Sequence, residues 1–344
     1  MRGVVFLGDR ELELREFPDP EPGPRDVIVE LRASGMCGSD LNTYRLSREQ
    51  RATRPMHIAG HEPCGVVVAC GAGVGDDEAP IGERVMVHHY SGCGRCRNCR
   101  IGYTQMCIHG SKVYGGNSAD GGHAKYIRVF PYMLVPLPDE LTFEEGAAVS
   151  CGTGTAFLAL ERLAVSGRDT LTVFGQGPVG LSATMLAKAM GARVIAVDMA
   201  PERLELAREL GADETIDAGA GDPVQAVKEL TRGDGADATL DCTGNPAARA
   251  NAVKSAVDWG RVCFVGEGNT ATFDMSPDII HKQLTLYGSW TFSTTGQARC
   301  ARFVIDRKIP LKRLLTHRFT LDEAEPAYKL FDTQTTGKGV FVFE

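Results

Sequence analysis

The sequence has little of what membrane, secreted and nucleic-acid-binding proteins need. Its 344 residues contain no apolar run of the ~18–20 residues that cross a membrane. The N-terminus meets charged residues too early for a secretory signal. Lys and Arg (37) are outnumbered by Asp and Glu (44), for a net charge of -7, whereas phosphate binding needs a basic face. We therefore expect no nucleic-acid partner and no membrane association, and the cytoplasm is the expected compartment.

Internal repeats and low-complexity segments are also lacking. The hydrophobic fraction of 43% and the charged fraction of 24% are those of an ordinary globular protein. A chain of this length exceeds a usual single domain, which predicts two hydrophobic cores.

Eleven cysteines are present, and four of them follow the spacing C-x2-C-x2-C-x7-C. Such short loops let four thiolates converge on one tetrahedral zinc and fill all of its positions. We therefore predict a structural zinc site that takes no part in the chemistry, formed by Cys93, Cys96, Cys99 and Cys107. Five further cysteines lie mostly in apolar, strand-like contexts and are expected to be inert core thiols: Cys64, Cys70, Cys242, Cys263 and Cys300. Thiolate zinc ligands and unpaired core thiols suit a reducing compartment.

The chain divides into two parts with different patterns of predicted secondary structure. Up to about residue 150, short strand candidates alternate with Gly, Pro and Asp turns; they cover 27–31, 65–69, 84–88 and 124–129. A capping box at 142–145 predicts a helix that continues into the following apolar segment. From residue 171, strands and helices alternate as far as about residue 288, which predicts a doubly wound parallel sheet. After about residue 290 we expect helices near 296–306 and 321–331 and a final strand.

A dinucleotide site is indicated by the pattern G-x-G-x-x-G between a predicted strand and a predicted helix. Gly175 permits the tight turn, Gly177 lets a pyrophosphate approach the backbone, and Gly180 allows close helix–strand packing. Asp198 ends the next strand, where its carboxylate can bind both ribose hydroxyls and repel a 2′-phosphate. This favours NAD over NADP. Arg203 either flanks the ribose or is a solvated arginine on a helix face.

A second metal site is indicated by Cys37 and by the pair His61-Glu62, which fall at the ends of strand-like segments. Asp40 is placed to accept the far N–H of the histidine. Cys151 lies where the β-rich N-terminal part meets the part with alternating strands and helices, and it supplies a third ligand. Three protein ligands with one open position are typical of a catalytic zinc.

This ordered set of motifs resembles the zinc-dependent medium-chain alcohol and polyol dehydrogenases over essentially the whole chain. The matching segments are Cys37–Asp40, Gly60–Glu62, the four-cysteine run, Asp120–Gly122, Cys151-Gly152, Gly175–Gly180 and Asp198. The resemblance implies an α/β fold with a β-rich, GroES-like catalytic domain (1–152 and 291–344) and a Rossmann domain (153–290). It also implies two zinc ions per chain, a nicotinamide cofactor, and a homodimer or homotetramer.

The resemblance further assigns roles to individual residues. Cys37, His61 and Cys151 match the ligands of the catalytic zinc, and Glu62 matches the acid beside the metal. Ser39 matches the hydroxyl that receives the substrate proton, with Asp40 behind it in the catalytic set. The cofactor-binding set that it implies is Thr155, Gly175, Gly177, Pro178, Val179, Gly180, Asp198, Arg203 and Lys338, the last beside the pyrophosphate.

Two departures from the family pattern concern the branch and the proton path. Sorbitol- and threonine-dehydrogenase-like members usually carry Glu-Pro in place of Cys151-Gly152. Many members end the proton relay with a histidine where this chain has Asn42, which cannot act as a base at neutral pH. The proton must then leave through ribose hydroxyls and water, or through another histidine such as His57.

The substrate is expected to be a small-molecule alcohol. His89 and Tyr90 end the strand before the four-cysteine run, and in this family that strand end borders the substrate pocket. Together with His57 and Trp290 as further pocket candidates, they favour a polyol, sugar or cyclitol, unless they are ordinary surface residues. The alternatives are a simple alcohol or aldehyde dehydrogenase, a zinc-free enone reductase and a non-catalytic nucleotide sensor.

Overall fold

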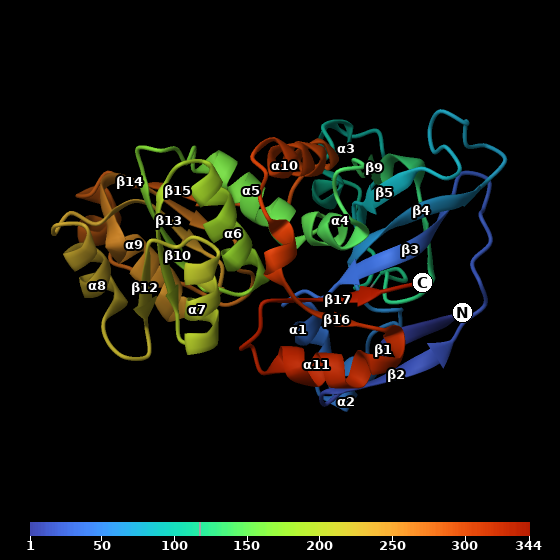
Figure 1. The fold of residues 1–344 in the computed structure, drawn as a ribbon, viewed down its shortest axis with the longest axis horizontal. Coiled ribbons are helices and arrows are strands. Elements are labelled where there is room, and N and C mark those ends of the chain that lie inside the picture. The colour runs from blue at the N-terminus through green and yellow to red at the C-terminus, as the bar shows by residue number, and fades with distance from the viewer. Residues whose placement is uncertain (117) are drawn as a thin grey trace.

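The computed structural model describes residues 1–116 and 118–344 and has two lobes that lie side by side (Figure 1). One lobe is built on a six-stranded parallel sheet and the other on a seven-stranded sheet. Both termini lie in the second lobe, so the chain crosses to the first lobe and returns. This is the α/β architecture that the sequence predicted.

The six-stranded sheet has the strand order β12-β11-β10-β13-β14-β15, and every neighbouring pair is parallel. Its strands are β10 (Thr170–Phe174), β11 (Arg193–Asp198), β12 (Glu214–Asp217), β13 (Ala236–Asp241), β14 (Ala256–Phe264) and β15 (Thr285–Gly288). The helices around it are α5 (Gly152–Arg162), α6 (Pro178–Ala189), α7 (Pro201–Glu209), α8 (Pro223–Leu230) and α9 (Pro246–Ser255). Side chains of α5 and α6 pack on one face, and those of α8 and α9 pack on the other. The predicted doubly wound sheet is confirmed.

The seven-stranded sheet runs β16-β17-β3-β4-β5-β9, with β8 paired to β3. Its strands are β3 (Val27–Gly35), β4 (Glu62–Cys70), β5 (Arg84–Val87), β8 (Tyr126–Val129), β9 (Leu134–Pro136), β16 (Leu315–Phe319) and β17 (Lys338–Val342). β17 comes from the C-terminal segment and pairs with β3 from the N-terminal one. The C-terminal segment is therefore an integral part of this lobe.

The remaining elements surround this second sheet. They are β1 (Arg2–Gly8), β2 (Glu11–Glu16), α1 (Asp40–Tyr44), α2 (Arg48–Ala52), β6 (Tyr90–Ser91), α3 (Arg97–Arg100), β7 (Lys112–Val113), α4 (Phe143–Val149), α10 (Thr294–Asp306) and α11 (Ala324–Asp332). The described residues also form short 3-10 helices, η1 (Thr104–Met106), η2 (Pro131–Met133), η4 (Leu311–Leu314) and η5 (Leu321–Glu323), and a π-helix, η3 (Met275–Ile280). The β1–β2 hairpin was not predicted from the sequence; its turn places Asp9 and Arg10 at positive φ.

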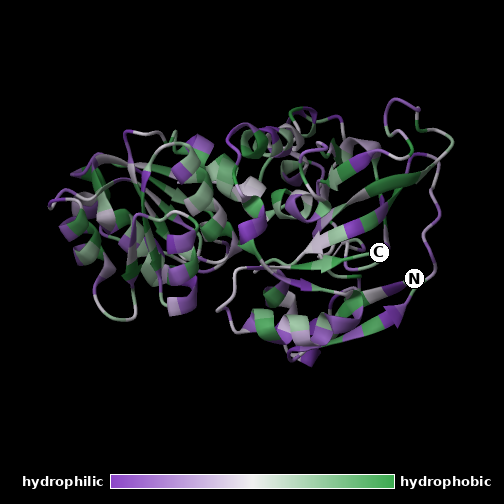
Figure 2. Ribbon diagram, in the orientation of Figure 1, coloured by the Kyte–Doolittle hydropathy of each residue, from purple (hydrophilic) through white to green (hydrophobic). Residues whose placement is uncertain are grey.

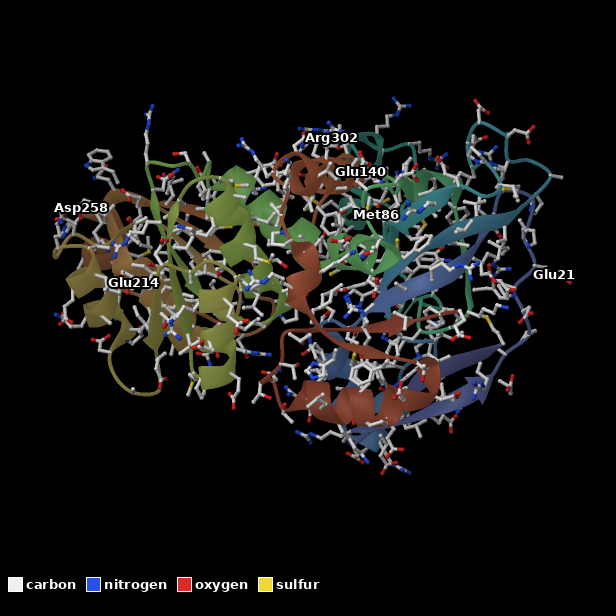
Figure 3. All side chains as sticks on the ribbon, in the orientation of Figure 1. Glu21, Met86, Glu140, Glu214, Asp258 and Arg302 are labelled. Carbon is white, nitrogen blue, oxygen red and sulfur yellow. The ribbon has the colours of Figure 1, made fainter. Side chains whose placement is uncertain are left out.

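Hydrophobic residues concentrate on the strands of both lobes, and hydrophilic ones follow the outer surfaces of the helices (Figure 2). Met86 lies inside the second lobe, whereas Glu21, Asp258 and Arg302 project from the periphery (Figure 3). Within the described residues, no helix is long and apolar enough to cross a membrane.

The helix predicted from residue 142 onward is interrupted at one residue. Thr142 caps α4 through the expected reciprocal bonds with Glu145. The apolar run then breaks at Cys151, whose φ and ψ of -149° and -80° lie outside the helical region, and α5 starts at Gly152. The break turns one apolar segment into two helices and puts a thiol between them.

Gly180 offers a test of the packing between α6 and the strand that precedes it. A Cβ at this position would lie 1.7 Å from the carbonyl oxygen of Gly175, which leaves no room for a methyl group. We expect Gly180→Ala to lower the free energy of unfolding by about 1–3 kcal/mol, the usual cost of overpacking. Thermal unfolding measures this loss.

Gly221→Ala is the matched control, because a Cβ there would have no neighbour within 4 Å. We expect its midpoint to equal or slightly exceed that of the parent protein. Equal midpoints for the two variants would contradict the predicted steric conflict.

Candidate active site

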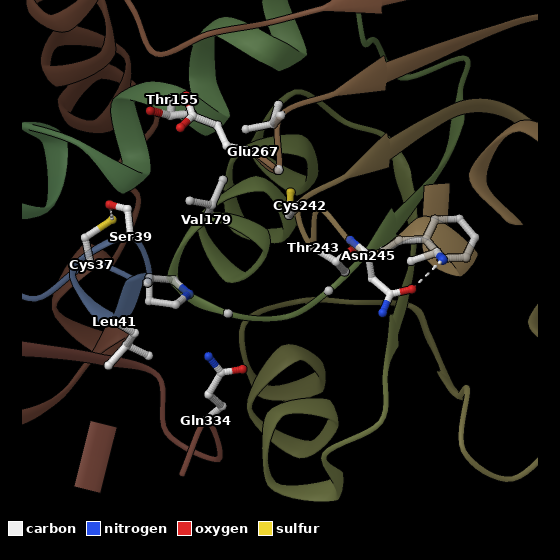
Figure 4. Close-up of a pocket in the computed structure, with 18 of the residues that line it drawn as sticks. Cys37, Ser39, Leu41, Thr155, Val179, Cys242, Thr243, Asn245, Glu267 and Gln334 are labelled. Carbon is white, nitrogen blue, oxygen red and sulfur yellow. Dashed lines mark hydrogen bonds between the residues drawn. The ribbon is translucent and has the colours of Figure 1, made fainter. Parts of the chain in front are cut away.

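A cavity of roughly 870 Å³ opens between the two lobes. Figure 4 shows residues of the seven-stranded lobe, including Cys37 and Ser39, on one side, and Thr243 and Asn245 on the other. Of the residues predicted to form the site, the cavity is lined by Cys37, Ser39, His61, His89, Tyr90, Cys151, Thr155, Gly175, Gly177, Pro178, Val179, Asp198, Arg203 and Trp290. The structure therefore brings the metal-ligand, cofactor and substrate candidates to one space.

Four potential metal ligands meet at the wall of this cavity. Cys37 follows β3, His61 and Glu62 stand at the start of β4, and Cys151 occupies the break between α4 and α5. Their donor atoms all lie within 4.8 Å of one another. All four residues are buried, and three of them, Cys37, His61 and Cys151, reach the cavity wall.

This donor set fits a zinc ion. Two sulfur atoms on a tetrahedral zinc, each bonded at about 2.3 Å, lie about 3.8 Å apart; the sulfur atoms of Cys37 and Cys151 are 4.0 Å apart. The hydrogen bond from Cys151 and the charge of His61 hold the pKa of the Cys37 thiol well below its usual range. A thiolate is the form that binds metal.

Asp40 fixes the orientation of the imidazole. Its carboxylate accepts a hydrogen bond from Nδ1 of His61 at 2.9 Å, which leaves Nε2 facing the thiols. The backbone N–H of Cys37 and the hydroxyl of Tyr328 donate to the same carboxylate at 2.9 and 3.1 Å. Tyr328 in turn lies 2.7 Å from Nε2 of His123, a fully buried histidine. A buried hydrogen-bonded chain therefore supports the metal ligand from behind.

The four-cysteine run forms a separate, compact lobe. The sulfur atoms of Cys93, Cys96, Cys99 and Cys107 lie within 4.8 Å of one another. Hydrogen bonds led by the backbone N–H of Cys99 lower the pKa of the Cys96 thiol to about 6. Four sulfur donors with no fifth ligand fit a closed tetrahedral zinc site.

The glycine turn forms the side of the cavity where a cofactor was predicted to bind. Gly175 has a φ of +87°, and Gly177 caps α6 and lines the cavity. The carboxylate of Asp198 accepts hydrogen bonds from the backbone N–H groups of Gln176 and Met199 at 2.5 and 2.8 Å. Arg203 is not a solvated helix-face residue, because its Nε donates to the carbonyl of Thr336 and its guanidinium approaches the glycine turn. An open glycine turn beside an anchored acid fits a dinucleotide.

Comparison with known proteins agrees with this geometry. Residues 23–139 match the family model described as alcohol dehydrogenase GroES-like domain, and residues 178–306 match the one described as zinc-binding dehydrogenase. An uncharacterized zinc-type alcohol dehydrogenase-like protein of Escherichia coli (strain K12) is 43% identical, with 100% of this chain and 99% of that protein covered. The chain belongs to the zinc-type alcohol dehydrogenase family.

Two further members show the range of that family. An L-threonine 3-dehydrogenase of Symbiobacterium thermophilum is 32% identical, over 96% of this chain and 93% of the relative. The solved structure of galactitol-1-phosphate dehydrogenase from Escherichia coli superposes with a TM-score of 0.87, at 27% identity and full coverage of both chains.

In this member of the family, the cavity wall around His89 is polar and aromatic. The rings of Tyr90 and Trp290 meet edge to face with centroids 5.9 Å apart. Nδ1 of His89 lies 3.1 Å from the carbonyl of Ser150, and burial lowers the pKa of His89 well below its usual range, so its ring is neutral. Glu267 adds a carboxylate to the lining.

His57, a predicted candidate for the substrate pocket and for the proton path, lies elsewhere. His57 pairs with Asp120 at 3.5 Å and does not line the cavity. His88, next to His89, is fully buried behind the cavity wall, where burial lowers its pKa to about 4. The strand end at residues 88–90 pointed to the pocket, but only the fold shows that His89 lines it and that His88 does not.

Several lining residues of the dehydrogenase were not anticipated. Cys242, Thr243 and Asn245 follow β13, and Asn269 follows β14; Leu41 and Gln334 line the side shown with Cys37 in Figure 4. Ligands bind at the carboxyl ends of parallel strands, so the end of β13 was a usable signal. Cys242 was expected in the core but contributes to the cavity wall instead.

Lys338 lies behind the metal ligands and does not line the cavity where a pyrophosphate would bind. It is fully buried and forms an ion pair with Glu62, and Nζ also donates to the carbonyl of Met36 at 3.2 Å. Burial alone would lower the pKa of Lys338, but the charge of Glu62 raises it, so the ammonium stays protonated. The expected contact with the cofactor is replaced by a contact with the acid beside the metal site.

Breaking this buried pair should be costly, because one polar partner would remain unpaired in the interior. We expect Lys338→Met to lower the free energy of unfolding by about 3–5 kcal/mol, and Lys338→Met combined with Glu62→Gln to recover much of the loss. Thermal denaturation in excess zinc measures both variants.

Lys329→Met is the control. Lys329 forms an exposed ion pair with Glu325 at 2.6 Å, and exposed pairs contribute less than about 1 kcal/mol. If Lys338→Met and Lys329→Met had the same thermal midpoint, the buried pair would have no special role in stability.

Proposed function

We propose that this protein is a zinc-dependent, NAD-linked dehydrogenase that oxidises a primary or secondary alcohol group to a carbonyl group. Its proposed substrate is a polyol, sugar or cyclitol. One observation carries the proposal: the Cys37–His61–Cys151 donor set and the glycine turn at Gly175 open into the same cavity. Hydride transfer needs the reacting carbon and the nicotinamide side by side in such a space.

The residues of the site have distinct parts in this reaction. When bound, zinc supplies a Lewis acid and the nicotinamide accepts a hydride. Cys37, His61 and Cys151 would hold the metal, with Glu62 beside them. The hydroxyl of Ser39 lies 3.2 Å from Nε2 of His61 on the cavity wall, so it can accept a hydrogen bond from the substrate hydroxyl.

The onward path of the proton follows from the neighbouring side chains. Asn42 lines the cavity but cannot take up a proton at neutral pH. His57 pairs with Asp120 and does not line the cavity. We therefore infer that neither side chain carries the proton onward; a bound dinucleotide would supply ribose hydroxyls for the path to water.

A neutral, hydroxylated substrate suits the part of the cavity wall formed by Tyr90, Glu267 and Trp290. Burial raises the pKa of the Tyr90 phenol, and the charges of Cys151 and Glu267 add to this shift. Tyr90 and Glu267 both line the cavity. A carboxylate beside a phenol can bind vicinal hydroxyls, and it repels a phosphate or carboxylate group. The aromatic faces of Tyr90 and Trp290 supply an apolar surface for the C–H groups of a polyol.

A substrate panel tests the proposal. Neutral polyols and cyclitols (sorbitol, galactitol, myo-inositol), galactitol 1-phosphate, L-threonine and 2-propanol are each assayed with NAD and with NADP by following reduced nicotinamide. We expect the highest kcat/KM for a neutral polyol or cyclitol with NAD. A preference for 2-propanol would favour a simple alcohol dehydrogenase, and no turnover with any alcohol would favour a nucleotide sensor.

Substitutions of the predicted zinc ligands should distinguish the two metal sites. We expect Cys37→Ala and His61→Ala to abolish turnover while each variant keeps the zinc of the four-cysteine lobe, close to one ion per chain. Cys93→Ser should instead lower the thermal midpoint and the zinc content while the Cys37 site stays loaded. Elemental analysis and thermal unfolding distinguish the two sites, and full activity in Cys37→Ala would overturn the assignment.

Asp198 should determine the choice of cofactor. Its carboxylate is held by backbone N–H groups at the end of β11, where a 2′-phosphate would meet a fixed negative charge. We expect Asp198→Ser to reduce the NAD-over-NADP ratio of kcat/KM at least about tenfold, which corresponds to about 1.4 kcal/mol. Asp217→Ser, at the equivalent end of the neighbouring β12, is the control and should leave the ratio unchanged.

A further inference from the structure

The four-cysteine lobe contacts the substrate side of the cavity through two consecutive residues. Thr104 and Gln105 lie in the turn η1, between Cys99 and Cys107 of the lobe. Both side chains are buried, with 2% and 3% of their surface exposed. Neither residue is a metal ligand, and neither lines the cavity.

Gln105 holds the segment that carries Trp290. Its Nε2 donates to the hydroxyl of Thr291 at 2.8 Å and to the carbonyl of Phe292 at 2.9 Å, and it lies 3.3 Å from the carbonyl of Trp290. One side-chain amide thus serves three acceptors in three successive residues. These residues follow β15 and precede α10, and two of them, Trp290 and Thr291, line the cavity.

The held segment has few other polar anchors. Throughout residues 1–116 and 118–344, the backbone groups of residues 290–292 make no hydrogen bond to other backbone groups. Thr291 also has a φ of +50°, an unfavourable value for a residue with a branched Cβ. Phe292 is packed in the interior against His88. Gln105 is therefore the main group that fixes Trp290 and Thr291, while Phe292 keeps the segment attached to the core.

Thr104 holds the backbone at Tyr90, the second ring of the Tyr90–Trp290 pair. Its hydroxyl donates to the carbonyl of Tyr90 at 2.8 Å. Tyr90 and Trp290 are about 200 residues apart in sequence, yet their rings meet at an interplanar angle of 70° on the cavity wall. One turn of the lobe therefore sets the backbone positions of both rings.

We propose that Gln105 is a positioning residue for substrate selection, and that the four-cysteine lobe, through Gln105 and Thr104, fixes the Tyr90–Trp290 wall of the substrate side. The lobe thereby acts on the choice of alcohol without touching the reacting atoms. The part of this inference that concerns alcohols rests on the proposed dehydrogenase function.

Tryptophan fluorescence tests the positioning directly. The sequence has two tryptophans, and Trp259 is 75% exposed, so Trp259→Phe leaves Trp290 as the single reporter. In this background we expect Gln105→Met to shift the emission to longer wavelength and to raise the acrylamide quenching constant about twofold or more. Met106→Ala, an exposed neighbour in the same turn, should leave both unchanged.

Kinetics test the consequence for the substrate. We expect Gln105→Met to raise the KM for the best alcohol of the panel about five- to tenfold, the loss that one or two neutral hydrogen bonds produce. The KM for NAD and kcat should stay within about twofold of the parent values, because the cofactor side and the metal ligands do not touch Gln105. Cys93→Ser, which opens the lobe, should move the Trp290 emission in the same direction.

A second variant covers the case in which Gln105→Met fails to fold or loses zinc from the lobe. Thr291→Val removes the acceptor at 2.8 Å from the opposite side and leaves the lobe intact. It should give a smaller increase in quenching in the same direction. Unchanged Trp290 fluorescence in the folded variants overturns the positioning proposal. If the parent protein oxidises no alcohol, the proposed function fails, and the fluorescence result alone decides the role of Gln105.

Discussion

Two sulfur atoms 4.0 Å apart, from residues separated by 114 positions, are the constraint on which the rest of this structure depends. Cys37 follows a strand of the seven-stranded sheet, and Cys151 directly precedes the first helix of the parallel-sheet lobe. Two thiols can approach this closely in the interior because α4, which ends just before Cys151, packs against β3 and β4. The chain enters the parallel-sheet lobe directly after Cys151, so the cavity between the lobes opens beside this pair.

The surroundings of this point are polar to an extent that protein interiors rarely tolerate. The buried groups include Asp40, Glu62, His123 and Lys338. Each has a partner: Asp40 binds His61, Glu62 pairs with Lys338, and His123 binds Tyr328. A buried polar group without a partner destabilises the folded protein. A network in which each group has its partner therefore specifies one arrangement of the side chains around the metal ligands. Lys338 and Tyr328 come from the C-terminal segment, which explains why that segment must return to the lobe that begins the chain.

Much of this could be predicted from the sequence because the signals were local. The cysteine spacing of the four-cysteine lobe, the strand–glycine–helix context of Gly175 and the strand–helix alternation each depend on short stretches of chain. Asp40 was recognisable because it is three residues from Cys37. The failures were long-range. Lys338 was assigned to the pyrophosphate because no short-range pattern shows that β17 places it behind Glu62. His57 stands near cavity residues in sequence, but only the fold shows that it turns toward Asp120.

The break at Cys151 has a mechanical meaning. α5 starts at Gly152, immediately after this thiol, and packs along α6, the helix that the glycine turn begins. If the parallel sheet rotated about this junction, the lever arm from the pivot to the thiol would be only one residue long. Cys151 would stay almost still while more distant walls, such as the end of β11 near Asp198, travelled further. The cavity could then widen and narrow with little strain on Cys37, His61 and Cys151.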